Sequence, residues 1–410
     1  MSDFLEKVNN FVWGNGLVFL LLATGIIFTL KLRFIQFRLP KFLLSGKKSD
    51  NSGLSQLKTV CMSLGTTMGT GNITGTATAL ATGGAGAVFW LWVSAFLGMA
   101  TVYAENVLSA EYSDDYCKGS MAYLSKGLGM HPLAWIFALF CVLASFGMGG
   151  MVQVNTFAES LSETCRINPV IIFAVTFAVI YAITSGGAER IGTSAQYLLP
   201  VASVAYALAC IAVLIVFRQN IPHVFGEIFR KAFNFKSVSG GFTGYAVSVG
   251  IRRGIFSNEA GLGSSPILHS SAGETEPHIQ GMWSMFEVFF DTILCCTLTA
   301  VTLMCATDNF SVTQTFSAVM GNFSKPFITA ELCIFALCTV IGWYYCGETA
   351  FRYITGRENK LFCLIFAVIS ASGAMFSAKS VWTLSDIFNG LMAFPNLIGL
   401  LFLMKHVKKE

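Results

Sequence analysis

Charged residues are what this sequence has least of. Its 410 residues include 26 Lys and Arg and 22 Asp and Glu, so that 12% are charged, against about 25% in an ordinary soluble domain. Hydrophobic residues make up 54%, and the mean hydropathy is +0.65. Because this deficit of charge extends over the whole length, most of the surface is expected to meet lipid. No soluble stretch with a basic face is present, which excludes a nucleic-acid-binding protein.

Paired cysteines and clustered histidines are also missing. The twelve cysteines lie almost entirely within apolar segments and form no Cys-x-x-Cys pair. The five histidines are far apart in the sequence, at His131, His223, His269, His278 and His406. A disulfide framework or a zinc site therefore has little support, and the cysteines are interpreted as small buried residues.

A basic region of the kind that opens a signal peptide is absent as well. The first apolar run, from Phe11 to Leu30, follows the acidic residues Asp3 and Glu6 and precedes a strongly basic stretch. This pattern is typical of a retained transmembrane helix whose C-terminal end lies in the cytoplasm.

Long apolar runs, by contrast, recur along the chain. A helix needs about 20 mainly apolar residues to cross the hydrocarbon core, and we predict an all-α integral membrane protein with about eleven transmembrane helices. Their expected ranges are 11–31, 58–82, 86–110, 132–160, 169–185, 194–217, 243–270, 279–305, 327–352, 360–376 and 381–404. Without the first helix, ten remain, and they form two sets of five with opposite starting sides, as a 5+5 inverted repeat requires.

The predicted organisation has five parts. They are an N-terminal extra transmembrane helix with a basic cytoplasmic loop (1–57), the first five-helix repeat (58–218), an extracellular connection (219–242), the second five-helix repeat (243–404) and a cytoplasmic tail (405–410). One side of this topology receives fifteen basic residues: Lys31, Arg33, Arg38, Lys41, Lys47, Lys48, Lys118, Lys126, Arg190, Arg352, Arg357, Lys360, Lys405, Lys408 and Lys409. The other side receives eight: Lys7, Arg166, Arg218, Arg230, Lys231, Lys236, Lys325 and Lys379. Because Lys and Arg favour cytoplasmic loops, we predict a bacterial or archaeal plasma (inner) membrane protein with its N-terminus outside and its C-terminus in the cytoplasm.

Two predicted helices are interrupted by glycine at corresponding positions. The first helix of the first set reads Gly-Thr-Thr-Met-Gly-Thr-Gly-Asn-Ile-Thr-Gly from Gly65 to Gly75, and the first helix of the second set reads Ser-Asn-Glu-Ala-Gly-Leu-Gly-Ser-Ser-Pro from Ser257 to Pro266. Glycine lowers the cost of leaving helical geometry, and proline removes a backbone donor. Unwound backbone inside a membrane must be satisfied by something polar, which a zwitterionic substrate and a cation can provide. The alternative is that these glycines only allow close helix packing.

At these residues the sequence resembles the alanine/glycine:cation symporter family, also called the sodium:alanine symporter family, which has a leucine-transporter-like fold. The matching motifs cover about residues 58 to 402: Gly69-Thr70-Gly71-Asn72-Ile73-Thr74-Gly75, Phe89-Trp90-Leu91-Trp92-Val93, Gly98-Met99-Ala100-Thr101 with Glu105, Arg253-Gly254-Ile255-Phe256-Ser257-Asn258-Glu259-Ala260-Gly261, Gln280-Gly281, Phe290-Asp291-Thr292, Gly342-Trp343 and Pro395-Asn396-Leu397. The chain departs from the family pattern at Ala85, where the family usually has Pro, and at Cys346, where it usually has Tyr. The second departure could alter the size of the pocket or the substrate preference.

The resemblance implies a site for a small neutral amino acid and Na⁺. The substrate would be bound by backbone N–H groups of Thr70, Gly71 and Asn72, with Gln153, Phe256, Gly261 and Trp343 completing the pocket. Na⁺ would be bound by the carbonyls of Gly65 and Met68 and by the hydroxyl of Thr339. Simpler interpretations stay open: Gln153 could only tie two helices together, Trp343 could be a bulky core residue, and Thr339 could bond its own helix backbone.

Carboxylates inside the predicted spans are costly and therefore functional candidates. They are Glu105, Glu159, Glu259, Glu287, Asp291 and Glu348. For Glu259, in the second interruption, we favour structural pairing or capping of freed N–H groups over substrate contact, with Arg252 and Arg253 as partners or as charges of an extracellular gate. No histidine or nucleophile accompanies these acids in the sequence, which argues against an enzyme.

The sequence therefore predicts a secondary active symporter that takes up a small neutral amino acid of the alanine and glycine class with Na⁺ by alternating access. The alternatives are a proton-coupled or exchange transporter on the same fold, which could carry glutamine, and then a gated channel or sensor. Na⁺ is expected as the coupling ion, with no cofactor. The expected partners are the amino acid, Na⁺ and the lipid bilayer, with no nucleic acid, and the protein is expected to be a monomer.

Overall fold

The computed structural model describes residues 2–45, 55–233, 245–272, 276–357 and 360–408. Within these ranges the chain is helical, with short connections and no strand. The residues up to the connection between the two predicted repeats form α1 (Ser2–Val12), α2 (Asn15–Lys31), η1 (Ile35–Arg38), α3 (Leu39–Leu44), α4 (Gln56–Thr67), η2 (Thr70–Asn72), α5 (Thr74–Gly83), α6 (Gly86–Tyr112), α7 (Ser120–Ala122), η3 (Tyr123–Gly127), α8 (His131–Ala144), η4 (Ser145–Val152), α9 (Gln153–Cys165), α10 (Pro169–Thr184), α11 (Gly187–Val216), η5 (Arg218–Asn220) and α12 (Ile221–Ala232). The remaining elements are α13 (Tyr245–Asn258), α14 (Ser265–His269), α15 (Pro277–Val288), η6 (Phe289–Cys296), α16 (Thr297–Ala306), α17 (Val312–Met320), η7 (Gly321–Phe323), α18 (Ser324–Thr355), α19 (Lys360–Ser372), η8 (Gly373–Met375) and α20 (Ala378–Phe402).

Seven helical runs of the described residues are long and apolar enough to cross a membrane: Phe4–Lys31, Gly86–Tyr112, His131–Cys165, Gly187–Val216, Pro277–Ala306, Val312–Thr355 and Ala378–Phe402. The apolar helices Pro169–Thr184 and Lys360–Met375 are shorter. Two further segments, α4 to α5 and α13 to α14, are broken helices. Each predicted range thus coincides with one of these helices, whereas the number that cross the membrane and the inverted repeat remain predictions.

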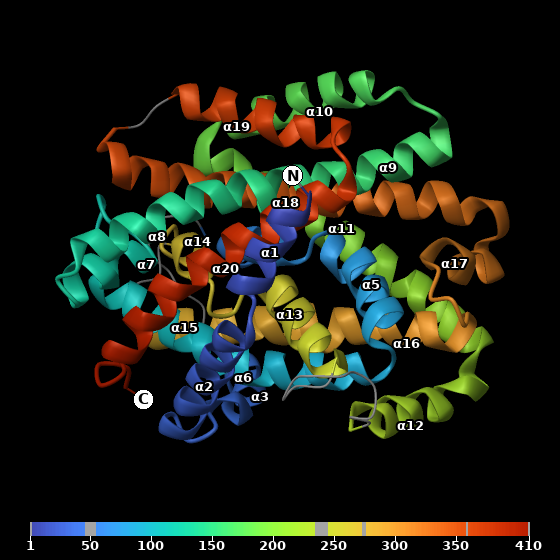
Figure 1. Ribbon diagram of the computed structural model, residues 1–410, viewed down its shortest axis with the longest axis horizontal. Coiled ribbons are helices and arrows are strands. Elements are labelled where there is room, and N and C mark those ends of the chain that lie inside the picture. The colour runs from blue at the N-terminus through green and yellow to red at the C-terminus, as the bar shows by residue number, and fades with distance from the viewer. Residues whose placement is uncertain (1, 46–54, 234–244, 273–275, 358–359, 409–410) are drawn as a thin grey trace.

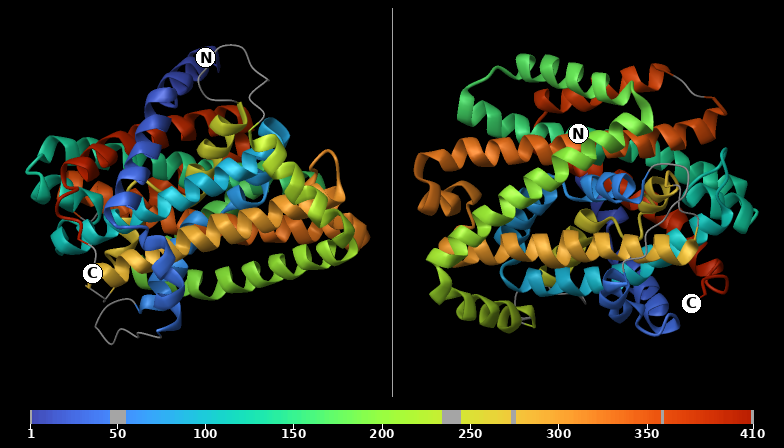
Figure 2. Two further views of the ribbon diagram at one scale, coloured as in Figure 1. Left: turned by 90° about the horizontal axis from the view of Figure 1, so that it is seen from below. Right: turned by 180° about the vertical axis from the view of Figure 1, so that it is seen from behind.

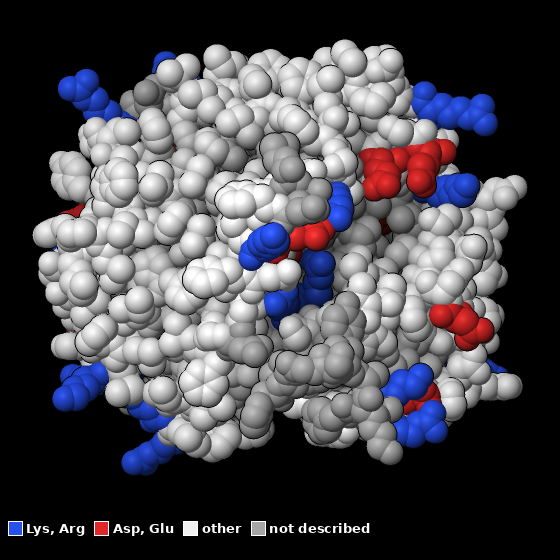
Figure 3. Space-filling view, in the orientation of Figure 1, with Lys and Arg blue, Asp and Glu red and all other residues white. Residues whose placement is uncertain are grey.

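Most of the long helices run roughly along the long axis of the molecule (Figure 1 and Figure 2). One end carries α7 and the C-terminus, with α3 between that end and the centre of the molecule, and the opposite end carries α12 and α17. These are called the α3 end and the α12 end below. On the face drawn in Figure 3, Lys and Arg lie mainly toward the two ends, with one further charged group in a hollow near the centre. The broad uncharged areas between them match a surface that meets lipid. Lys47, Lys48, Lys236 and Lys409, which enter the orientation prediction, lie outside the described residues.

The two broken helices lie against each other in opposite directions. The first half of the second one, α13, packs against α5, and its second half, α14, packs against α4. The first break includes Gly69, whose backbone is extended with φ −105° and ψ −156°. The second break runs from Glu259 to Ser264, with φ values of +87° at Gly261 and +82° at Gly263. Glycine adopts such positive φ angles without the steric cost that a side chain imposes.

Helix α18 packs closely along the first half of the first broken helix. A Cβ atom on Gly65 would lie 3.2 Å from Cβ of Cys338, and a Cβ on Gly342 would overlap the Thr66 hydroxyl. Small residues at these contacts let the two backbones approach, which stabilises helix pairs inside a membrane. The glycines therefore serve close packing in α4 and α18, while those of the two breaks allow non-helical backbone.

Candidate functional site

The first break is held by the amide side chain of Gln153 from α9. Its Oε1 accepts hydrogen bonds from the backbone N–H of Thr70 at 3.1 Å and from the Thr70 hydroxyl at 2.9 Å. Its Nε2 donates to the Met148 carbonyl at 3.2 Å. A Cβ on Gly69 would lie 2.9 Å from Gln153 Oε1 and 2.6 Å from Thr339 Oγ1, so no side chain fits there. The structure thus brings Thr70, Gln153 and Thr339 together around one glycine.

The predicted Na⁺ ligands of α4 and α18 are partly adjacent. The Thr339 hydroxyl lies 2.9 Å from the Gly65 carbonyl and 3.2 Å from the carbonyl of Phe335 in its own helix. The Thr339 hydroxyl thus lies near the carbonyl of another predicted ligand and near the carbonyl of its own helix that the simpler interpretation names. Met68 is buried, and its N–H donates to the Leu64 carbonyl at 2.6 Å. Of the three predicted ligands, Gly65 and Thr339 are in direct contact.

A buried carboxylate connects the first break to the second. Asp291 lies in η6, a π-helical segment of the long helix that α15 begins. Its Oδ1 accepts from Asn72 Nδ2 at 2.7 Å, and its Oδ2 accepts from the hydroxyls of Ser257 and Thr292, both at 2.7 Å. Asp291 and Thr292 are completely buried. π-helical turns often occur at functional sites, and this one carries a carboxylate to the point where the two broken helices meet.

The same cluster contains an acceptor without a donor. Asn72 Oδ1 is buried and has no hydrogen-bond partner among the described residues. No Lys, Arg or His of the described chain forms an ion pair with Asp291. The cluster therefore offers oxygen atoms and one negative charge in a site from which water is largely excluded, which is the chemistry that binds a small hard cation.

In the second break, Glu259 connects the unwound backbone to α18. Its Oε1 accepts from Trp343 Nε1 at 2.9 Å, and its Oε2 accepts from the hydroxyl of Ser264. Glu259 and Trp343 are both fully buried. On its other side, Trp343 fills the space in which a side chain on Gly149 would lie. This geometry is the structural pairing expected for Glu259, and it fixes the Trp343 ring between the second break and η4.

A second polar network holds the far part of this break. Asn396 of α20 donates to Glu105 Oε1 at 2.5 Å and to the Gly261 carbonyl at 2.9 Å. Its Oδ1 accepts from the Tyr123 hydroxyl. A Cβ on Gly261 would lie 2.6 Å from a methyl carbon of Leu21 in α2. Gly261 therefore faces α2 and α20. Gly71 and Phe256, which are predicted to line the same pocket as Gly261, face each other at a different place.

Phe256 forms a wall beside the first break. A Cβ on Gly71 would lie 3.8 Å from the Phe256 ring. The ring stacks on Trp382 of α20, with centroids 5.2 Å apart, and the guanidinium of Arg253 lies over both rings at 5.8 and 5.1 Å. A cation over aromatic faces is attracted to them. The Arg253–Phe256–Trp382 stack therefore separates Gly71 from the cavity described next.

A cavity of about 300 Å³ lies on the other side of this stack, in the charged hollow of Figure 3. Its lining includes Arg252, Arg253, Phe256 and Asp386. Trp13, between α1 and α2, donates from Nε1 to the Asp386 carbonyl at 2.7 Å, and its own carbonyl accepts from Arg252. Arg252 and Arg253 thus line this cavity, and their role as charges of an extracellular gate remains a prediction.

Two features of the buried acids could not be identified from the sequence. The sequence marks Asp291 as a functional candidate but assigns it no role, because its hydrogen-bond partner Asn72 is 219 positions away. The expectation that no histidine accompanies the acids is wrong, because His269 contacts Glu287. The other two candidates are less central, since Glu159 is exposed and Glu348 accepts from the hydroxyl of Tyr344.

Comparison with known proteins gives a consistent result. The model of the family described as "Sodium:alanine symporter family" matches residues 1–410. The "Sodium/alanine symporter AgcS" of Methanococcus maripaludis is 39% identical over 433 aligned residues, covering 99% of this chain and 95% of the relative. The "Probable sodium/glutamine symporter GlnT" of Bacillus subtilis is 33% identical over 434 residues, covering 99% of this chain and 90% of the relative. The solved structure of MhsT in complex with L-phenylalanine matches with a TM-score of 0.69 at 14% identity, over 88% of this chain and 91% of that chain.

Proposed function

Because the chain belongs to the sodium:alanine symporter family, we propose that it takes up a small neutral amino acid of the alanine and glycine class together with Na⁺. The family and the leucine-transporter-like fold are those of secondary transporters that span the membrane several times, and not of enzymes. Transport would proceed by alternating access, with the site between the two broken helices opening to one end of the molecule at a time.

The observation that carries Na⁺ coupling is the fully buried Asp291 without a basic partner among the described residues. An isolated buried carboxylate is costly unless a positive charge accompanies it. Na⁺ beside Asp291 would gain oxygen ligands from Asn72 Oδ1 and the Ser257 hydroxyl, and it would supply the partner that Asn72 Oδ1 lacks. A second ion would bind at Gly65, Met68 and Thr339.

The substrate would bind between the first break and Phe256. Backbone N–H groups of Gly71 and Asn72 would receive its carboxylate, joined by that of Thr70 once it leaves Gln153 Oε1, to which it donates in this structure. Phe256 and Trp343 would limit the size of the side chain. Packing of Gly71 against the Phe256 ring favours alanine and glycine over larger substrates.

The α3 end would face the cytoplasm, because the basic residues before α4 and at the C-terminus favour that side. The protein would then work as a monomer in the plasma membrane of a bacterium or archaeon. Coupling to protons, or exchange, on the same fold is the second candidate, and a relative named as a probable sodium/glutamine symporter supports glutamine as a candidate substrate.

Uptake into proteoliposomes tests this proposal. Radiolabelled alanine should accumulate when an inward Na⁺ gradient is imposed, and the initial rate should fall to background when choline replaces Na⁺. In the control, choline again replaces Na⁺, and an inward proton gradient is imposed in place of the Na⁺ gradient. Uptake of equal rate under that condition would overturn Na⁺ coupling in favour of proton coupling. Competition by the other amino acids, each in excess, would define the substrate class.

A further inference from the structure

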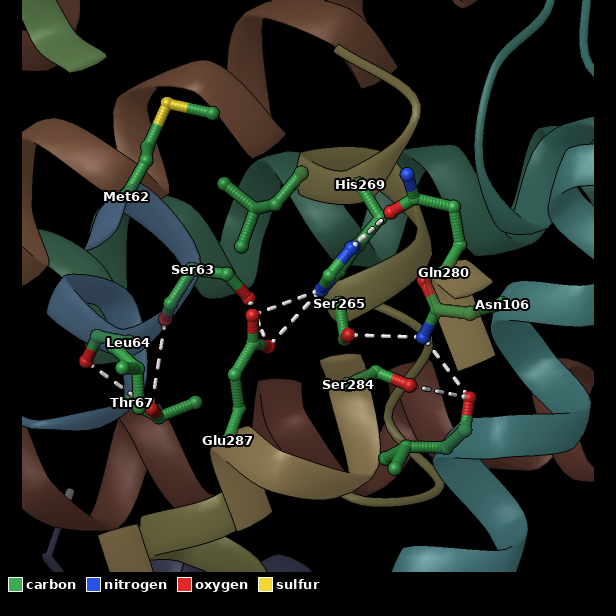
Figure 4. A network of polar contacts seen from close by, with 12 residues as sticks. Met62, Ser63, Leu64, Thr67, Asn106, Ser265, His269, Gln280, Ser284 and Glu287 are labelled. Carbon is green, nitrogen blue, oxygen red and sulfur yellow. Dashed lines mark hydrogen bonds and ion pairs between the residues drawn. The ribbon is translucent and has the colours of Figure 1, made fainter. Parts of the chain in front are cut away.

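Glu287 is a second buried carboxylate on the helix that carries Asp291, and its partner is a histidine. His269, the last residue of α14, places Nε2 3.0 and 3.1 Å from the two carboxylate oxygens (Figure 4). Ser63 of α4 donates to Glu287 Oε2 at 2.6 Å. The exposed fractions are 3% for His269 and 2% for Glu287. One carboxylate thus joins α4, α14 and α15 in a site without access to water.

The hydrogen bonds determine how many protons this pair holds. His269 Nδ1 lies 2.6 Å from Gln280 Oε1, while Gln280 Nε2 donates to Gln56 Oε1 at 3.1 Å. With the Gln280 amide oriented in this way its oxygen faces the ring and only accepts, so that Nδ1 carries the hydrogen. Nε2 and the Glu287 carboxylate must share another proton, since without one both would be acceptors. The closed cluster therefore holds one proton more than a neutral imidazole beside an ionised carboxylate.

Among the residues that the structure describes, no other cation pairs with Glu287. Cys61 of α4 and Glu259 of the second break lie close enough to Glu287 to interact with it electrostatically. Asp291 follows one helical turn later. On the α6 side, Tyr103 bonds Nδ1 of His278 at 2.9 Å. No Lys or Arg forms an ion pair with Glu287 in the described part of the chain. The shared proton is thus what balances this buried negative charge.

The pair lies where the α3 end must open. Helices α4 and α14 are the halves of the two broken helices that lead to this end, and both contact α15 through the cluster. A path to the α3 end that opened between these two halves and α15 would move α4 or α14 away from α15. That movement separates His269 from Glu287 and admits water, in which an imidazole is mostly neutral above pH 7.

We propose that the His269–Glu287 pair is a proton-binding site in the gate at the α3 end, filled when the gate closes and emptied when it opens. This inference rests on the proposed transport cycle. The proton enters and leaves at the same end, so no net proton crosses the membrane. Reclosure nevertheless needs a proton from the α3 side, which makes transport sensitive to pH on that side alone.

Vesicles of defined orientation test this sidedness. An affinity tag after the C-terminus, at the α3 end, would sort sealed vesicles, and Na⁺-driven alanine uptake would be measured with pH varied on one side at a time. Because one proton is required, raising the pH at the α3 end from 6.5 to 8.5 should slow saturated uptake at least about threefold, with a limit of about tenfold per pH unit. The same change at the α12 end should leave the rate unaltered, and a trapped pH dye should report no net proton per alanine.

Variants assign the effect to this pair. In a Glu287→Gln, His269→Gln double variant, two amides replace the proton-sharing groups, and the dependence on α3-end pH should disappear. The matched control is His278→Gln, which removes a histidine near the start of α15 and should keep the wild-type profile. Stabilisation against heat by alanine and Na⁺ would establish that each variant is folded. If the double variant does not fold, Glu287→Gln alone takes its place, and the sidedness of the wild type remains decisive.

Three results would overturn the proposal. They are a wild-type rate independent of pH at the α3 end, an equal dependence from both ends, and a folded double variant with the wild-type profile. A net proton movement coupled to each alanine would also contradict it, because the proton would then cross the membrane. By contrast, the absence of Na⁺-driven uptake at every pH would count against the proposed function itself, which separates the two failures.

Discussion

Glu287 and Asp291 stand four residues apart on one helix, yet their surroundings differ in charge. Asp291 is bonded by an amide and two hydroxyls, so its carboxyl group has no cationic partner among the described residues. Glu287 is bonded by a hydroxyl and an imidazole, with which it shares a proton. Both side chains are buried. Burial requires a compensating positive charge in each case, and the two sites differ in where it comes from.

The comparison separates an ion site from a gate. Asp291 meets residues of both breaks, Asn72 and Ser257, and it would obtain its charge from an ion that arrives with the substrate. Glu287 meets the halves of the broken helices that lead to the α3 end, and the positive charge that compensates it is the proton it shares with His269. The first arrangement is suited to coupling, and the second to sealing one end of the path.

Neutralising the two acids one at a time gives the largest expected difference. Asp291→Asn removes the charge that would hold Na⁺, and loss of one partner of a buried charge pair costs about 2–5 kcal/mol. We expect the Na⁺ concentration for half-maximal alanine uptake to rise at least about 30-fold, which corresponds to about 2 kcal/mol. Uptake at varied Na⁺ measures this.

Glu287→Gln is the matched variant for that experiment. It also removes one carboxylate from the same helix, but it should leave the half-maximal Na⁺ concentration within about threefold, or about 0.7 kcal/mol, while changing the response to pH. An equal loss of Na⁺ affinity in both variants would contradict the division into an ion site and a gate. If the Asp291→Asn variant kept the Na⁺ affinity of the wild type, the proposal that Asp291 binds Na⁺ would be wrong.

Removing the donor to each acid should give a smaller effect of the same kind. Asn72→Ala takes away one hydrogen bond to Asp291 and the unpartnered Oδ1, and hydrogen bonds to charged groups contribute about 1.5–3 kcal/mol. We expect Na⁺ affinity to fall about tenfold. Ser63→Ala, which removes the hydroxyl bonded to Glu287, should leave Na⁺ affinity unchanged. Na⁺-dependent thermal stabilisation of both purified variants measures this, and the reverse order of effects would refute the comparison.

The sequence predicts the helices and the two breaks well, because these depend on local properties. Apolar runs identify the spans, and the glycines from Gly65 to Gly75 and around Gly261 mark where helical geometry ends. The family resemblance, which the comparison with known proteins confirms, then names most residues near the breaks. Gly65 contacts Thr339 and Thr70 contacts Gln153, while the binding roles that the resemblance implies for these residues remain predictions.

The partners of the buried acids could not be predicted in the same way. The Asn72–Asp291 bond joins residues 219 positions apart, and it depends on how α13 and η6 pack beside the first break. His269 and Glu287 are only 18 positions apart, but they lie on different helices and meet because α14 and α15 both pack against α4 and α6. Spacing in the sequence indicates neither contact, and the π-helical turn at Asp291 leaves no pattern in its residues.

Substitution of an exposed acid should have the smallest effect on transport. It extends the comparison of the two buried acids to a carboxylate that is not buried. Asp114, between α6 and α7, forms an ion pair with Lys126 and accepts from the N–H groups of Tyr116 at 2.9 Å and Cys117 at 2.8 Å. The bond from Lys126 is the main reason why the pKa of Asp114 is lowered. A lowered pKa stabilises the folded state at pH values above the ordinary Asp pKa of about 3.9 and ceases to do so as pH falls below it. Asp114→Asn should therefore lower the thermal midpoint equally at pH 7.5 and 5.5 and by less at pH 3.5. Since exposed pairs contribute at most about 1 kcal/mol, Na⁺-driven uptake should not change, and a large loss of uptake would show that burial is not what separates these three carboxylates.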